Sequence, residues 1–277
     1  MYKDLMIPMT GTSADADALA LAMALAKSHG AHLSALEIVD LPMPMLQPWG
    51  MMPDAATYAA HASLREHGAA NLARLQSRLS AEPVSSEAKL IEALYSEAPR
   101  VAARQAYDAD LTVVAGAIGD TAESVVPHAY FVSLLLESGR PVIVVPPRWA
   151  PTALARFTIA WQPTQEASRA IHDALPLLRN AERVDVLTIG EESAPEVEAS
   201  GQRIVRHLGR HGIDAHRVVR PRQGLTVAAA ILRCAGEVRS QALIAGGYGH
   251  SRLREWVLGG VTRELLIGAD IPLFFGH

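Results

Sequence analysis

Three glycines near the C-terminus have a spacing that could bind phosphate. Gly246 ends a short apolar run, Gly249 follows three residues later, and Gly259 comes ten residues after that, next to Gly260. Glycine tolerates positive φ and lets a ligand approach the bare backbone. Where such a loop enters a helix, the free N–H groups of the first turn point at a bound anion. The spacing therefore predicts an anion site, and nucleotide phosphate is the first candidate.

A weaker copy of this pattern lies in the first half of the chain. Gly116 and Gly119 repeat the first two glycines, but Ala129 stands where the later glycine would fall. No Gly-Lys dipeptide occurs in the sequence, which excludes a P-loop with its phosphate-reaching lysine. We therefore expect phosphate binding in the second half only, without P-loop machinery.

The elements that must position these glycines alternate regularly along the chain. Short aliphatic and β-branched runs alternate with helical patterns, which is typical of βαβ units in a mainly parallel sheet. Strands are expected over 4–9, 32–39, 84–90, 111–116 and 142–146, and again over 157–161, 183–189, 215–219, 242–246 and 271–275. Helices are expected over 14–29, 57–79, 99–107 and 125–137, and again over 165–178, 196–211, 227–239 and 261–267.

The same five-strand unit thus occurs twice. Gly116 and Gly246 are 130 residues apart, as are Gly119 and Gly249, so the ends of the two units are in register. The proline-rich stretch 146–151 reads as a stiff linker between them. We predict two α/β domains, over 1–147 and 152–277, each with a five-stranded mainly parallel sheet and helices on both faces.

Residues 40–53 interrupt the first unit. They contain four prolines and four methionines, a composition that excludes a regular helix or a central strand. One interpretation is a flap that packs over its own domain. The other is a lid or a surface for a protein partner, because exposed apolar patches usually have a use.

Composition limits the classes of partner. The net charge is -4, so the chain lacks the basic surface that nucleic acids need. The longest apolar stretch, 18–26, is about half of the ~18 residues that suggest a membrane span. A single cysteine, Cys234, agrees with a reducing compartment. We expect a cytoplasmic protein that binds neither nucleic acid nor membrane.

The repeated five-strand unit and the glycine spacing, followed by Val261 and Thr262, resemble the universal stress protein family in its tandem form. The resemblance implies two domains packed as an intramolecular pseudo-dimer. It also allows several copies of the chain to associate as a homo-oligomer. It also implies that the second domain binds ATP, ADP or AMP as cofactor, with or without Mg²⁺. Protein partners are a further expectation.

The resemblance also assigns residues of a nucleotide site. Gln162 stands where binding members carry an acidic residue facing the adenosine, and its amide can both donate and accept. Ile189 would lie beside the adenine. Gly260 replaces a Ser or Thr whose hydroxyl meets a phosphate oxygen, a contact worth about 1.5–3 kcal/mol. The residues implied at the phosphates are Gly246, Gly249, His250, Gly259, Gly260, Val261 and Thr262.

Other chemistry has weaker support in the sequence. Ser251 lacks the closing glycine of a nucleophile elbow, because Leu253 occupies that position. His207 and His211 share one helix face, which fits either a metal site or surface histidines. The loop offers cations in Arg252, Arg254 and Arg263 but no set of metal-holding carboxylates for phosphoryl transfer.

Three hypotheses follow from these patterns. The first is a stress-response protein that binds an adenine nucleotide and acts as a regulatory sensor rather than an enzyme. The second is a scaffold that binds no nucleotide and contacts protein partners through residues 40–53. The third is a slow ATPase.

Overall fold

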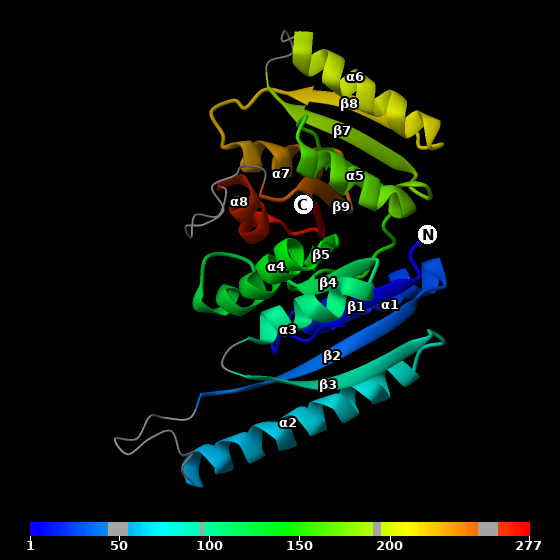
Figure 1. Cartoon of the computed structure of the whole chain (residues 1–277). Coiled ribbons are helices and arrows are strands. Elements are labelled where there is room, and N and C mark those ends of the chain that lie inside the picture. Colours follow the sequence, from blue (N-terminus) through cyan, green and yellow to red (C-terminus); the bar gives the residue numbers. More distant parts are fainter. Residues whose placement is uncertain (44–54, 95–96, 191–194, 249–259) are drawn as a thin grey trace.

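The computed structural model describes residues 1–43, 55–94, 97–190, 195–248 and 260–277. Within these ranges the strands form a ten-stranded sheet in the order β3-β2-β1-β4-β5-β10-β9-β6-β7-β8 (Figure 1). The strands of the first half are β1 (Asp4–Pro8), β2 (His32–Leu41), β3 (Ser86–Leu94), β4 (Leu111–Ala115) and β5 (Val142–Val145). Those of the second half are β6 (Arg156–Ala160), β7 (Arg183–Ile189), β8 (Ala215–Arg220), β9 (Ala242–Gly246) and β10 (Leu273–Gly276).

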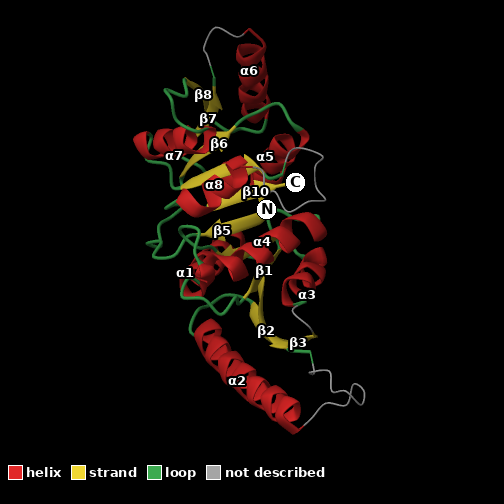
Figure 2. Cartoon of the chain, turned by 90° about the vertical axis from the view of Figure 1, so that its left-hand side faces the viewer, coloured by secondary structure: helices red, strands yellow, loops and turns green. Residues whose placement is uncertain are grey.

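Helices cover both faces of this sheet (Figure 2). One face packs against α1 (Asp15–His29), α2 (Ala55–Ser80), α5 (Gln165–Leu178) and α6 (Pro195–Arg210). The other packs against α3 (Ala98–Gln105), α4 (Val125–Glu137), α7 (Val227–Glu237) and α8 (Gly260–Gly268), and short 3-10 turns cover Ala106–Asp108 and Ala122–Ser124. Strands covered on both sides must be apolar along their whole length, and all five residues of β4 are buried.

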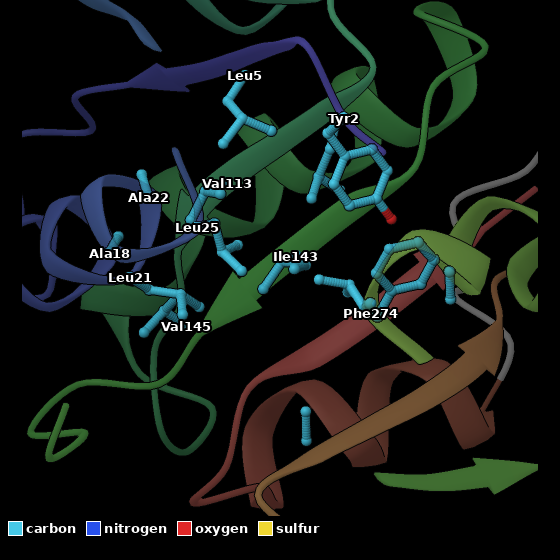
Figure 3. Close-up of a cluster of buried hydrophobic side chains, with 14 of the residues drawn as sticks. Tyr2, Leu5, Ala18, Leu21, Ala22, Leu25, Val113, Ile143, Val145 and Phe274 are labelled. Atoms are coloured by element: carbon cyan, nitrogen blue, oxygen red, sulfur yellow. The ribbon is translucent and has the colours of Figure 1, made fainter. Parts of the chain in front are cut away.

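The two halves of the sheet meet at β5 and β10. These strands pair antiparallel, with Phe274 opposite Ile143, whereas the other strand pairs are parallel. Figure 3 shows both side chains in the same buried cluster as Leu5, Val113 and residues of α1. Because the junction is antiparallel, the carboxyl ends of the strands of one half lie at the opposite edge from those of the other.

The expected α/β fold and its parallel strands are confirmed, with differences in detail. The strand expected over 84–90 is wrong in its bounds, because β3 pairs with β2 from Ser86 opposite Leu33 to Leu94 opposite Leu41. Pairing with β2 extends β3 four residues beyond the end expected from its apolar pattern. The expected pair of five-stranded sheets is one continuous sheet. Most of the segment 40–53 lies outside the described residues.

No helix in the described ranges is long and apolar enough to cross a membrane.

Candidate functional site

The predicted site residues come together at one edge of the second half. From β6 the chain crosses to β7 on one side, and from β9 it crosses to β10 on the other. In open α/β sheets, ligands bind in the crevice outside the carboxyl ends of two such strands. Ala160 of β6 is paired with Ala245 of β9, so Gln162 and Gly246 follow neighbouring strand ends.

The other predicted residues that the structure describes lie on elements next to this crevice. Ile189 ends β7, the next strand beyond β6, and is partly buried. Gly260, Val261 and Thr262 form the first turn of α8, which returns from the same edge. The predicted residues Gly249, His250 and Gly259 lie outside the described residues.

Gly246 is needed by the packing of the protein itself. A Cβ on Gly246 would lie 2.5 Å from the backbone nitrogen of Ala167 and 2.8 Å from the carbonyl carbon of Glu166. These atoms belong to the first turn of α5, whose N-cap Thr164 accepts a hydrogen bond from the N–H of Ala167 at 3.2 Å. Gly246 therefore lets α5 approach the end of β9, a role that spacing alone does not distinguish from ligand approach.

The next two residues contact the first half of the chain. A Cβ on Gly247 would lie 2.5 Å from Cδ2 of Leu135 on α4. Tyr248 has a left-handed backbone, with φ of 56°, and its ring centre lies 6.0 Å from that of Phe131 on α4. Its buried hydroxyl has no hydrogen-bond partner among the described residues. Helix α4 thus packs against the start of the predicted phosphate loop.

The start of α8 is open. Gly260 and Val261 are exposed, and a Cβ on Gly260 would find Oε1 of Glu264, at 3.9 Å, as its nearest neighbour. Thr262 is only 6% exposed, so its side chain faces the protein. Arg263, predicted as a cation for phosphate, forms an ion pair with Asp120 of the first half. N–H groups at a helix start point at a bound anion, and among the described residues this turn has exposed surface for one at Gly260 and Val261.

The side chain next to Gln162 belongs to the core. Trp161 packs against the buried cluster beneath α5, and its indole nitrogen donates to the hydroxyl of Ser200 on α6 at 2.9 Å. Gln162 itself is exposed. The exposed Gln162 amide can therefore meet a ligand, while the Trp161 indole links the end of β6 to α6.

The turn after β1 in the first half, which corresponds to the turn at Gln162, is occupied by a buried carboxylate. Asp15, at the start of α1, accepts hydrogen bonds from the Thr10 N–H at 3.0 Å, the Thr10 hydroxyl at 2.7 Å and the Gly11 N–H at 2.8 Å. Burial raises the pKa of Asp15, although these bonds act in the opposite direction. The polar groups that could meet a ligand at this turn already bind the protein's own carboxylate, whereas the start of α4, after the first-half glycines, is open, with Val125 65% exposed.

Other acidic side chains lie near this turn of the first half. The pKa of Tyr130 on α4 is raised by burial and then by the charges of Asp40, Asp15 and Glu37. A group of carboxylates repels a polyphosphate. Asp15 was not among the predicted site residues; the available signal was an Asp at a helix start three residues after Thr-Gly-Thr.

A small cavity lies between the halves, beside the first-half glycines. Its lining residues are Gly116, Ala117, Ser124, Pro127, His128, Phe131, Val144, Leu266 and Ile267. Nε2 of His128 is buried and has no hydrogen-bond partner in the described part of the chain. Burial lowers the pKa of this imidazole, and the charge of Arg263 lowers it further. Gly119 donates its N–H to the carbonyl of Ile267 at 2.9 Å, so the first-half loop anchors α8.

Comparison with known proteins identifies the family. The sequence model of the universal stress protein family matches residues 1–146 of the 277. The chain belongs to the universal stress protein family. The match covers the half in which we expected the weaker glycine motif. No curated protein matches the chain significantly.

Solved universal stress proteins share its fold over nearly the whole length. One from Archaeoglobus fulgidus DSM 4304 is 14% identical, with 98% of this chain and 94% of that chain covered and a TM-score of 0.75. A putative universal stress protein from Pseudomonas aeruginosa UCBPP-PA14 is 13% identical, with 99% and 92% covered and a TM-score of 0.58. At such identities the likeness establishes the fold.

Proposed function

We propose that this universal stress protein binds ATP, or a related adenine nucleotide, in its second half and acts as a regulatory sensor in the stress response. In this proposal residues 1–147 and 152–277 are tandem domains that form an intramolecular pseudo-dimer in the cytoplasm. The observation that carries it is the difference between the turns that follow the first strand of each half. Gln162 is exposed after β6, whereas the Thr10 hydroxyl and the Gly11 N–H after β1 are bound to Asp15.

The second-half edge offers complementary groups for the two ends of a nucleotide. The free N–H groups at the start of α8 and the helix dipole favour phosphate. The exposed amide of Gln162 can hydrogen-bond the adenosine, and Ile189 supplies apolar surface near the end of β7. Mg²⁺ would accompany the phosphates as part of the ligand. Binding would favour one arrangement of the loop before α8, and that shift is the proposed signal.

A charge placed at the start of α8 tests the location of the phosphates. Gly260→Glu adds a carboxylate where there is room for a side chain, and Gly260→Gln adds the same shape without the charge. Calorimetric titration with ATP should show binding to the wild type and an affinity at least ten-fold weaker for the Glu variant than for the Gln variant. No binding to the wild type at millimolar ATP would refute the proposal. Equal affinities for the two variants would place the phosphates elsewhere.

A scaffold function is the second candidate, and exposed apolar side chains favour it. Tyr58 on α2, the helix that follows the segment 40–53 in the chain, is 64% exposed, and Leu94 on β3, opposite Leu41, is 50% exposed. Deletion of residues 42–52 should then abolish capture of protein partners without changing the thermal unfolding of the chain. Unchanged capture would exclude this function. Slow ATP hydrolysis is tested by phosphate release, with Gly260→Glu as the control.

A further inference from the structure

Three histidine rings meet where α5 passes α6, away from the edge proposed for nucleotide. His172 lies on α5, His207 lies on α6, and His211 directly follows the end of α6. The ring centre of His207 is 5.2 Å from that of His172 and 4.7 Å from that of His211. The sequence predicts the shared face of His207 and His211, but His172 comes from another helix and is visible only in the fold.

The two ring separations are compatible with a shared metal ion. A zinc ion lies about 2.1 Å from an imidazole nitrogen, and the ring centre is about 1.1 Å further, so each ring centre lies about 3.2 Å from the ion. Two rings at a tetrahedral angle are then about 5.2 Å apart, and two at a right angle about 4.5 Å apart. Both measured separations fall within this interval.

One donor atom in the cluster is unused. Nε2 of His207 is buried and has no hydrogen-bond partner among the described residues. A buried nitrogen in this state carries a desolvation cost that a metal bond would remove. Burial lowers the pKa of His207, with smaller contributions from His211 and His172, which favours the neutral form that binds metals. His172 is exposed, which gives an ion a route from solvent.

The rings are close enough for a metal but are not oriented for one. As the side chains lie, no three His, Cys, Asp or Glu groups in the described ranges are placed to hold a metal ion. The planes of the neighbouring rings are inclined by 48° and 67°. Metal binding therefore requires the rings to turn about their side-chain torsions, whereas the helices already bring them near.

We propose that His172, His207 and His211 bind one divalent transition-metal ion of the zinc type, with water completing its coordination. Such an ion joins two helices on one face of the second half of the sheet. α6 is the outer of the two in Figure 1, so the ion ties the outer helix to its inner neighbour. An ion that binds only the folded chain also stabilises it by mass action. This proposal does not depend on nucleotide binding.

Metal titration of tag-free protein tests the site. Zn²⁺ titration by calorimetry should give one ion per chain, and the visible spectrum of bound Co²⁺ should show nitrogen ligands. His172→Ala, at an exposed position, should weaken binding at least ten-fold, and His207→Ala should do the same. The matched control is His216→Ala, which removes another exposed histidine, on β8, and should leave affinity unchanged.

Two results would overturn the proposal. The first is an affinity for Zn²⁺ in His172→Ala equal to that of the wild type, which would leave only a two-histidine chelate on α6. The second is an affinity for Zn²⁺ in His207→Ala equal to that of the wild type. Thermal unfolding provides a check that does not need a titration, because added Zn²⁺ should raise the Tm of the wild type and of His216→Ala but not that of His172→Ala.

Discussion

Replacing Gly260 by serine should tighten ATP binding if phosphate lies at the start of α8. The resemblance to nucleotide-binding universal stress proteins places a Ser or Thr hydroxyl at this position. The structure has room for it, because the nearest atom to an added Cβ is Oε1 of Glu264 at 3.9 Å, an ordinary contact distance. Gly260 is the first residue of α8, and helical backbone accepts a side chain in place of glycine without strain.

The size of the effect follows from one hydrogen bond to a charged acceptor. Such a bond contributes about 1.5–3 kcal/mol. Since about 1.4 kcal/mol corresponds to a factor of ten in Kd, the gain should be about 12-fold to 150-fold. A helical glycine also costs stability, so any side chain here should raise the free energy of unfolding by about 0.4–1 kcal/mol. That second effect must be separated from the first.

Gly260→Ala separates the two effects, because alanine stiffens the unfolded chain as serine does but carries no hydroxyl. Calorimetric titrations of the wild type and both variants should be made with ATP and with adenosine at one ionic strength. We expect tighter ATP binding for the Ser variant alone and no change for adenosine. An equal gain for Ala and Ser, or a gain for adenosine, would refute a phosphate contact at this turn.

Further predictions concern stability. Gly246→Ala should lower the free energy of unfolding by about 1–3 kcal/mol, since its Cβ would collide with the backbone of α5. Gly190→Ala is the control, because no described atom lies within 4 Å of its added Cβ. Equal urea midpoints for the two variants would contradict this prediction. His128→Gln should reduce the loss of stability on acidification, because a folded-state pKa below the unfolded value near 6.5 means that stability present above pH ~6.5 is lost as the pH falls below it. Urea titrations at pH 7.5 and pH 5 measure the free energy of unfolding of the wild type and of His128→Gln. An equal loss between the two pH values in both proteins would count against this prediction. Tyr248→Phe should keep or raise stability, because its buried hydroxyl has no described partner, whereas Tyr248→Ala should lose the contact with Phe131; a Phe variant clearly less stable than the wild type would reveal a bond to that hydroxyl.

The elements could be predicted from sequence because the sheet is buried on both faces. Continuous apolar runs such as β4 can be detected locally, and the bounds of β7 and β9 agree with the expected ones. β3 could not be bounded in this way, since its length follows from its pairing with β2 rather than from its half-exposed side chains. The antiparallel junction of β5 and β10 has no local signal, because it joins the last strands of the two halves, which lie far apart in the sequence.

The candidate site was predicted from the spacing of its glycines, whereas the contacts of these residues required the structure. Spacing identified Gly246, yet the backbone of α5 explains why no side chain fits there. The charge of Arg263 suggested a phosphate ligand, while its partner Asp120 lies in the other half. The third histidine of the cluster, His172, is on a different helix from His207 and His211. Each of these facts depends on contacts between distant residues, which composition and periodicity do not encode.

The same antiparallel junction gives the first half a role at the proposed site of the second. Because the two carboxyl edges lie on opposite sides, helix α4 ends near the glycine loop of the second half, and α8 ends near that of the first. Leu135 therefore packs on Gly247, and Phe131 packs on Tyr248. On the other side, Gly119 donates its N–H to the carbonyl of Ile267. A left-handed backbone is costly for a large side chain, so the contact of Tyr248 with Phe131 offsets part of the cost of its conformation. The first half thus packs on the start of the glycine loop of the second half, and a ligand that changes the backbone of Tyr248 would alter the contact between the halves.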